Sequence, residues 1–398
     1  MLFTKNKIQK MDKKQLLFDL YISYLQARRH KRHTHSQMAF EIELESNLVQ
    51  LCNNIYSWTY QISPSIYFIQ QSPVKREVFA WNFRDRIVHH LIYNYISPYR
   101  EKQFIYDSYS CRKGKWTLLW IERVSKFMRS CSDCYTKPWR ILKLDIQWYF
   151  MAINRDILRK KINDVLSNWK TITENKDNKI FPNGKFLISW GFPEYLIKII
   201  HEIIYNDPTT NGIFKWKSSD YDWLPKTKSL FFSEQNCGLP LWNLTSQLFS
   251  NIYLNDFDHY VKENLWIKYY GRYVDDFVII HPNKEYLKSL IEPINKYLNY
   301  TLHLKLHPNK IYLQPISHWL QFLWAIIKPY RLYRGKRTIT NFYKKLKETN
   351  YKPERSSLDA YIWLMIHYKH YKMINKILNK IWHENVKNIS EYASKFLE

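Results

Sequence analysis

The chain lacks the features that would direct it into or across a membrane. It has no run of about 18 or more uncharged apolar residues, which excludes an ordinary membrane-spanning helix. The first residues, MLFTKNKIQKMDKK, contain no apolar core and no small-residue cleavage site, so they do not predict a signal peptide. We therefore expect a cytoplasmic globular protein without a membrane partner. With 398 residues and 45% hydrophobic content, the chain can bury a sizeable core in two or three domains or one multi-lobed domain.

Cysteine is also scarce. The five cysteines are an odd number in a long chain without a secretory signal, which argues against a disulfide framework. One CxxC pair, Cys131 and Cys134, stands alone without a second pair or a following pair of histidines. Free thiols are the simpler interpretation, and a zinc site is the alternative.

Acidic residues are few compared with basic ones. The chain has 35 Asp and Glu against 61 Lys and Arg, a formal net charge of +26. Such an excess is typical of proteins that bind the phosphates of nucleic acids. A general bias of the source toward lysine is one alternative. An anionic membrane surface is another, although no clean basic amphipathic helix supports it.

Apolar periodicity predicts helices in four regions. Residues 12–60 and 76–100 have helical spacing, and Pro98 should close the second region. A third helix should begin near Asn154, and a fourth should cover 244–265 with one apolar stripe. The basic segment after Lys328 predicts a separate helical lobe.

Two segments predict strands that end in carboxylates. RILKLDIQWYF, residues 140–150, alternates in the manner of a strand and carries Asp145 near its end. WIKYYGRYVDDFVII predicts a hairpin whose two strands meet at Val274 and Asp275. Adjacent carboxylates between apolar runs are costly unless a cation offsets their repulsion. An ordinary Asp-Asp turn is the alternative for Asp275 and Asp276 taken alone.

Three carboxylates on neighbouring strands of a basic chain suggest phosphoryl-transfer chemistry. Such a set can bind two Mg²⁺ about 4 Å apart, which activate an attacking hydroxyl and stabilise the leaving oxygen. Asp145, Asp275 and Asp276 are therefore the candidate metal ligands, with a two-metal Mg²⁺ site as the expected cofactor.

Three motifs together resemble the palm of reverse transcriptases. They are LKLDIQWYF, GLPLWNLTSQLFSNIYLN and YVDD, in the chain order that this fold requires. FRDRIVHHLIYNYI, SCRKGK, YYGRYVDDFVI and FLWAIIKPYR are similar to the reverse transcriptases of diversity-generating retroelements, with the likeness running from about residue 20 to 380. Related enzymes of group II introns, retrons and antiphage systems share the palm but usually have Gln-Gly where this chain has Leu241-Trp242.

The resemblance implies an α+β right-hand polymerase. Its parts would be N-terminal helices and fingers over 1–139, a palm over 140–328 and a helical thumb over 329–398. The implied activity is RNA-directed DNA synthesis with dNTPs on an RNA template from a DNA or RNA primer. For this family it implies a template-repeat RNA, mutagenic copying that diversifies a target gene, and a small basic accessory protein.

The resemblance also assigns roles to single residues. Asp145, Asp275 and Asp276 would bind metal, and Lys310 would protonate the departing pyrophosphate. Phe150 would be the aromatic gate against a ribose 2'-OH. The residues implied to contact the incoming nucleotide or its phosphates are Arg112, Lys113, Phe150, Leu241, Asn243, Gln247 and Tyr273.

Leu241 stands where ordinary reverse transcriptases have a glutamine that helps to hold the nucleotide. An aliphatic side chain removes one hydrogen bond there, which fits a family that miscopies template adenines. The alternative is that Leu241 only packs.

Glycine is strongly depleted relative to average usage. Seven glycines are far fewer than the roughly 28 that average usage predicts, while tryptophan occurs 16 times. Trp148, Trp242 and Trp324 stand where the resembled family has glycine. The same holds with less clear alignment for other tryptophans: Trp116, Trp120, Trp216, Trp223, Trp266, Trp319 and Trp363.

We interpret this pattern as the product of a gene that reads UGA as glycine but was translated with UGA as tryptophan. TGA codons at Trp148, Trp242 and Trp324 would support that interpretation, and TGG codons would refute it. The alternative is genuine tryptophans that stack on bases. A chain that truly carries Trp148 and Trp242 should be impaired as a polymerase, since an indole fills space that glycine leaves open.

Overall fold

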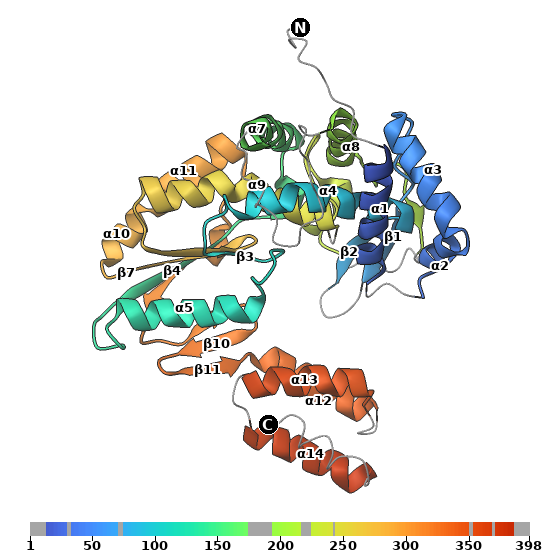
Figure 1. The fold of residues 1–398 in the computed structure, drawn as a ribbon. Coiled ribbons are helices and arrows are strands. Elements are labelled where there is room, and N and C mark those ends of the chain that lie inside the picture. Colours follow the sequence, from blue (N-terminus) through green and yellow to red (C-terminus); the bar gives the residue numbers. More distant parts are fainter. Residues whose placement is uncertain are drawn as a thin grey trace. The chain divides into compact units, whose positions relative to one another are not determined.

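The computed structural model describes eight stretches of the 398 residues: 13–29, 33–70, 75–173, 193–215, 224–241, 243–349, 353–367 and 371–385. Helices and sheets are mixed along the whole described chain (Figure 1), which confirms the predicted α+β class. Among these residues, none of the helices has both the length and the apolar character needed to span a bilayer.

The chain divides into two compact units. The first contains Met1–Trp116, Lys143–Val278 and Lys288–Ile311, and the second contains Thr117–Leu142, Ile279–Leu287 and Tyr312–Glu398. The division into fingers, palm and thumb at residues 139 and 328 stays a prediction.

The N-terminal helices of the first unit confirm the periodicity of residues 12–60. They are α1 (Lys13–Arg28), α2 (His35–Ile42) and α3 (Leu44–Tyr56), followed by α4 (Phe83–Glu101). Helix α1 packs on α4, and Leu16 and Leu20 of α1 are fully buried. Asn82 caps α4, because its side-chain oxygen accepts a hydrogen bond from the Arg84 amide at 3.0 Å.

Two details of the predicted helix at 76–100 were wrong. Its first five residues form strand β2 (Arg76–Ala80), antiparallel to β1 (Ile66–Gln70), with β5 (Ile213–Phe214) parallel on the other side of β1. The short run REVFA is compatible with both helical and strand periodicity, and its pairing with β1 makes it a strand. Pro98 does not end α4, since a proline near the C-terminus removes only one helical hydrogen bond.

A five-stranded sheet carries the candidate site. Its order is β3-β6-β7-β4-β8. The strands are β3 (Ser108–Tyr109), β4 (Arg140–Asp145), β6 (Tyr269–Tyr273), β7 (Asp276–His281) and β8 (Tyr312–Pro315). Strands β6 and β7 form the predicted hairpin, with a two-residue turn at Val274 and Asp275.

Helix α9 (Leu244–His259) is the central helix of the first unit and lies against α4, α7 and α11 (Figure 1). Its predicted apolar stripe is buried at Leu248, Phe249, Ile252 and Phe257. It continues into a π-helical turn, Tyr260–Asn264. Further helices of the first unit are α6 (Tyr149–Ala152), α7 (Arg155–Thr173), α8 (Glu194–Tyr205) and α11 (Ile291–Leu302), and α10 (Lys284–Ser289) begins in the second unit. Short 3₁₀ segments in the described part of the chain include Lys226–Lys228, Leu230–Phe232 and Pro308–Lys310.

The second unit combines a small sheet with helices. Helix α5 (Thr117–Cys131) packs on the sheet β11-β10-β9, where Trp120 meets Phe322 edge to face at 5.7 Å. These strands are β9 (Leu320–Phe322), β10 (Ala325–Lys328) and β11 (Arg331–Arg334), so the helical lobe begins after a strand that the sequence did not predict. The lobe contains α12 (Lys336–Glu348), α13 (Arg355–His367) and α14 (Tyr371–Asn385) around a core that includes Phe342.

Candidate active site

The structure brings the three candidate aspartates to neighbouring strand ends in the first unit. Asp145 is the last residue of β4, Asp275 lies in the β6–β7 turn, and Asp276 begins β7, the neighbour of β4 in the sheet. The backbone joins the two places directly, because the Ile146 amide donates to the Asp275 carbonyl at 3.1 Å. The grouping expected from the sequence is therefore present.

A third segment closes the other side of Asp145. The His307 amide donates to the Asp145 carbonyl at 2.8 Å, and the Gln147 amide donates to the Lys305 carbonyl at 2.8 Å. These bonds hold residues 305–310 beside the end of β4, and this segment carries Lys310. A lysine 165 residues away from Asp145 in the chain thus becomes its neighbour.

Two lysines hold the outer carboxylates. The Lys310 ammonium donates to both oxygens of Asp145, at 3.0 and 2.9 Å, while Asp145 is only 5% exposed. The Lys143 ammonium forms an ion pair with Oδ1 of Asp276 at 3.2 Å. Lys143 comes from β4, two residues before Asp145, and the sequence analysis did not identify it.

The three carboxylates of the cluster carry more negative charge than their two lysine partners balance. Burial, and then the charges of Asp276 and Asp145, raise the pKa of Asp275 to about 7. Burial also raises the pKa of Asp276, although the Lys143 ammonium acts in the opposite direction. Burial lowers the pKa of Lys310, but its hydrogen bond to Asp145 and the three carboxylate charges raise it above the ordinary value.

The donor set suits Mg²⁺, which prefers carboxylate oxygens and is attracted by uncompensated negative charge. Because Lys310 donates to both oxygens of Asp145, it competes with a metal ion for this carboxylate. Within the residues that the structure describes, no group of three or more His, Cys, Asp and Glu side chains has the arrangement of a metal site. The two-metal site therefore stays a proposal.

The CxxC pair shows free thiols. Cys131 is buried in α5, Cys134 is exposed, and neither forms a disulfide. Burial raises the pKa of Cys131 to about 12, so its thiol stays protonated near neutral pH. The Cys131 thiol is therefore not the low-pKa ligand that zinc selects.

The two basic residues implied to bind the triphosphate, Arg112 and Lys113, differ in their exposure to solvent. The guanidinium of Arg112 binds the Glu101 carboxylate at 2.8 Å and the carbonyls of Ile105 and Ser108 at 2.9 and 2.8 Å. Its side chain is 5% exposed, so in this structure it holds the turn before β3 and does not face solvent. Lys113 is exposed.

The other predicted nucleotide contacts lie at several places in the first unit. Phe150 is half-buried in α6, and its carbonyl accepts from the Leu239 amide at 2.9 Å. This bond brings α6 to the segment that leads to Leu241, which is half-buried in a turn. Asn243 precedes α9, and its buried Nδ2 has no hydrogen-bond partner among the described residues.

Gln247 is half-buried in the first turn of α9. Tyr273 ends β6 and pairs with Tyr109 of β3, directly before the turn with the aspartates. The nucleotide-binding roles of Phe150, Leu241, Asn243 and Gln247 remain predictions.

Trp148 has a backbone that favours glycine. It precedes α6 with φ 50° and ψ 37°, in the left-handed region, and it is 49% exposed. Trp58 and Trp266 also have positive φ values, 66° and 53°. Trp324 does not, because the left-handed residue of its turn is Leu323, and Trp120 is fully buried in α5. Trp242, Trp216 and Trp223 lie outside the described residues.

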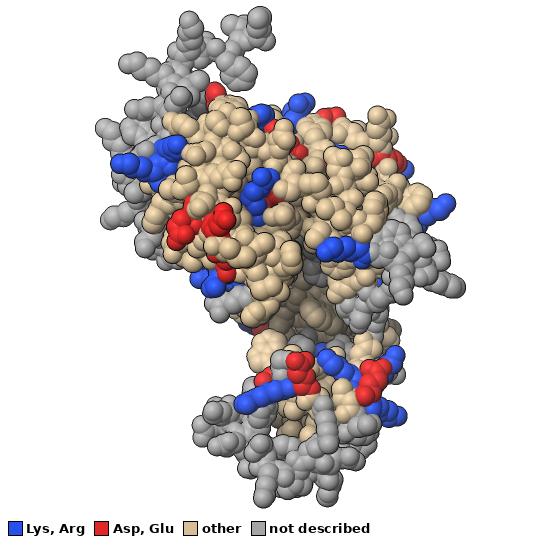
Figure 2. Space-filling model, turned by 90° about the vertical axis from the view of Figure 1, so that its right-hand side faces the viewer, with Lys and Arg blue, Asp and Glu red and all other residues tan. Residues whose placement is uncertain are grey.

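Basic side chains do not form one patch on the face shown in Figure 2. There, lysine and arginine side chains are scattered and acidic side chains lie among them. The excess of positive charge is thus not concentrated on this face of the described chain.

No protein-family model and no curated protein matches the chain. Solved structures similar to it include telomerases of two Candida species. A truncated apo telomerase of Candida tropicalis has a TM-score of 0.43 and 14% identity, covering 69% of this chain and 55% of that chain. Telomerase of Candida albicans, solved with a TWJ fragment of telomeric RNA, has a TM-score of 0.45 and 12% identity over 82% of this chain and 56% of that one.

A second Candida tropicalis structure, also with a TWJ fragment of telomeric RNA, has a TM-score of 0.45 and 13% identity, covering 90% of this chain and 60% of that chain. The chain thus spans 55% to 60% of the length of these three telomerase chains. At such low identity the function has to be argued from the site itself.

Proposed function

We propose that this chain is an RNA-directed DNA polymerase whose palm contains the β6–β7 hairpin and the end of β4. The observation that carries the proposal is the set of three aspartates on neighbouring strand ends, with Lys310 on Asp145 and Lys143 on Asp276. A buried acidic cluster with a carboxyl pKa of about 7 is costly for stability, and such costs are typical of functional sites.

The reaction would be nucleotidyl transfer. The primer 3'-oxygen forms a bond to the α-phosphorus of a dNTP, the bond from that phosphorus to the pyrophosphate oxygen breaks, and the hydroxyl proton is lost to solvent. Asp145 and Asp275 would hold Mg²⁺ with support from Asp276. When bound, Mg²⁺ supplies charge stabilisation for the attacking and leaving oxygens.

Lys310 would serve as the proton donor to the leaving pyrophosphate. Its ammonium is protonated beside Asp145, and it is 46% exposed, so it can reach a ligand from the solvent side. Phe150 would exclude a ribose 2'-OH, and exposed Lys113 suits a triphosphate better than Arg112 does. The partners would be an RNA template, a primer and dNTPs, with a small basic accessory protein.

The finer proposal places the enzyme in a diversity-generating retroelement. It rests on the sequence motifs, above all LPLWNLTSQ with Leu241. Such an enzyme would copy a template-repeat RNA with errors at adenines. An antiphage or group II intron-type reverse transcriptase is the alternative enzyme. If the tryptophans in the glycine positions are genuine, the alternative is an RNA-binding palm without catalysis.

The main test is primer extension on an RNA template with the Asp145→Ala variant. Extension should fall by about 10³-fold or more, because the metal-binding carboxylate is lost, while RNA affinity in a filter-binding assay changes little. Asp164→Ala, at an exposed position of α7, is the matched control and should behave as wild type. Equal activity in wild type and Asp145→Ala, or no extension by either, would leave the RNA-binding palm as the better proposal.

The error spectrum tests the finer proposal separately. Leu241→Gln restores an amide at the position where ordinary reverse transcriptases have one, so misincorporation opposite template adenines should fall by about 10-fold, or about 1.4 kcal/mol of discrimination. Sequencing of the cDNA measures the error rate at each template base. Leu241→Met is the control of similar size. An unchanged adenine error rate in Leu241→Gln would show that Leu241 only packs.

A further inference from the structure

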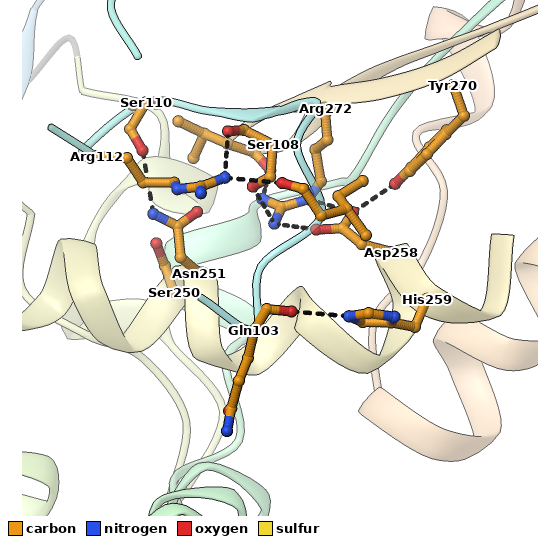
Figure 3. Close-up of polar contacts among 12 residues, drawn as sticks. Gln103, Ser108, Ser110, Arg112, Ser250, Asn251, Asp258, His259, Tyr270 and Arg272 are labelled. Carbon is orange, nitrogen blue, oxygen red and sulfur yellow. Dashed lines mark hydrogen bonds and ion pairs between the residues drawn. The ribbon is translucent and has the colours of Figure 1, made fainter. Parts of the chain in front are cut away.

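Arg272 lies fully buried beneath the turn that carries the aspartates. Its guanidinium holds Asp258 of α9 with two bonds, Nε to Oδ1 at 2.8 Å and Nη2 to Oδ2 at 2.6 Å (Figure 3). Nη2 also donates to the Ser108 hydroxyl of β3 at 3.2 Å. The Tyr270 hydroxyl donates a hydrogen bond to Oδ1 of Asp258 at 2.6 Å. Both Arg272 and Asp258 have no exposed side-chain surface.

The remaining nitrogen of Arg272 reaches the turn itself. Nη1 donates to the Val274 carbonyl at 2.8 Å. That carbonyl belongs to the peptide that enters Asp275, and the carbonyl of the peptide that leaves Asp275 accepts from the Ile146 amide at 3.1 Å. Both peptides on either side of Asp275 are therefore fixed, one by Arg272 and one by β4.

The turn needs such support, because Val274 has φ 55°. A β-branched residue in the left-handed region is a genuine outlier, and such a conformation persists only where surrounding contacts impose it. Ion pairing keeps Arg272 charged: burial lowers its pKa, but the charge and hydrogen bonds of Asp258 raise it above the ordinary value. A charged donor makes the stronger hydrogen bond to the Val274 carbonyl.

We propose that Arg272, fixed by Asp258, is a positioning residue that sets the direction of the Asp275 carboxylate for metal binding. The proposal rests on the proposed function for its role in catalysis. Its structural basis is one guanidinium that joins α9, β3 and the β6–β7 turn. Outer residues that orient metal ligands typically change metal affinity or activity by about 10–100-fold when mutated.

The test distinguishes two roles of Arg272: balancing the charge of Asp258 and positioning the turn. The neutral pair Arg272→Gln with Asp258→Asn leaves no unpaired charge in the core, so it should fold, but it removes the charged donor to the Val274 carbonyl. We expect its Mn²⁺ affinity, measured with Mn²⁺ alone from the electron paramagnetic resonance signal of the free ion, to fall by about 10-fold or more. The kcat for primer extension should fall similarly, with little change in the KM for dNTP.

Arg100→Gln is the control, since it removes a different buried arginine at the end of α4 that binds Gln103. It should keep wild-type Mn²⁺ affinity. Wild-type Mn²⁺ affinity and kcat in the neutral pair would overturn the proposal, because Arg272 would then only balance Asp258.

Arg272→Lys decides the matter if the neutral pair does not fold. Lysine keeps a positive charge opposite Asp258 but cannot bond Asp258 and the Val274 carbonyl in the same way. Lower Mn²⁺ affinity in the folded Lys variant supports positioning, whereas unchanged affinity, or failure of both variants to fold, overturns it. Absence of DNA synthesis by the wild type would refute the proposed function, while the Mn²⁺ comparison would still test the role of Arg272.

Discussion

Two groups of charges near the β6–β7 turn are built in opposite ways. The pair of Arg272 and Asp258 is fully buried, and each oxygen of Asp258 accepts a hydrogen bond from the guanidinium. The acidic cluster of Asp145, Asp275 and Asp276 has three carboxylates and two direct lysine partners, and Asp275 has a pKa raised to about 7. The first group is satisfied within the protein, and the second is not.

The contrast separates charges that are satisfied within the protein from charges that leave an excess of one sign. A buried ion pair with complete hydrogen bonding fixes the positions of the elements that it joins, and removing one partner leaves an uncompensated charge. A cluster with excess negative charge instead has a site where an additional cation lowers the free energy. Arg272 of the first group and Asp275 and Asp276 of the second lie in the same short hairpin, so mutations there can tell the two groups apart.

The largest expected effect is the loss of stability in Asp258→Asn. The change leaves the Arg272 charge buried and unpaired, so the free energy of unfolding should fall by about 3–5 kcal/mol. Urea unfolding at pH 8 measures it. The matched control is Asp256→Asn, two residues earlier on α9, where the exposed Asp256 carboxylate pairs with the less exposed Lys161 and the ion pair should contribute about 0–1 kcal/mol. Similar losses in the two variants would contradict the distinction between the groups.

A smaller effect, an increase in the free energy of unfolding, is expected when Asp275 is neutralised. Its pKa is about 7 in the folded protein and near 3.8 in an unfolded chain, so the folded state binds more protons between these values. Its contribution therefore makes stability fall as pH rises from about 4 to about 7, by an amount on the order of 1–2 kcal/mol. Asp275→Asn should lose this dependence and be at least as stable as wild type at pH 8.

The effect of Mg²⁺ on stability should also depend on pH. Because the ion binds ionised carboxylates, Mg²⁺ should raise the melting temperature of the wild type more at pH 8 than at pH 6. Thermal unfolding with and without Mg²⁺ at the two pH values measures this difference, with Asp164→Asn as the control. An equal Mg²⁺ effect at both pH values, or an undiminished effect in Asp275→Asn, would argue against metal binding at this carboxylate.

The sequence predicted those parts of the fold that have strong local periodicity. The stripe of α9 and the alternation of residues 140–145 both appear in the structure where they were expected. The strands Arg76–Ala80 and Arg331–Arg334 were missed, because runs of four or five residues carry too little periodicity and depend on pairing partners elsewhere in the chain.

The candidate site shows the same limit. The aspartates were identifiable because carboxylates interrupt apolar runs, and the family motifs pointed to Lys310. Lys143 and Arg272 gave no such signal, since one lysine or arginine among 61 basic residues is unremarkable until the fold shows what it contacts. For Arg112 the motif gave a position, but only the structure showed that its guanidinium faces inward.

The tryptophans show where sequence and backbone agree. Trp58, Trp148 and Trp266 have the left-handed conformation that glycine adopts without strain, which fits the interpretation of recoded glycines. Trp58 was not among the positions singled out from the sequence. Trp120 disagrees, because a fully buried indole in α5 has the surroundings of a genuine core residue.

The contact between Lys310 and Asp145 also affects how the site would be loaded. With an ammonium bound to both carboxylate oxygens, uptake of a metal ion at Asp145 is an exchange of one cation for another. The lost lysine contact opposes binding, so the ion should be held less tightly and leave more readily than from a cage of free carboxylates. For the proposed polymerase, which would release pyrophosphate in every cycle, an easily exchanged cation would be an advantage.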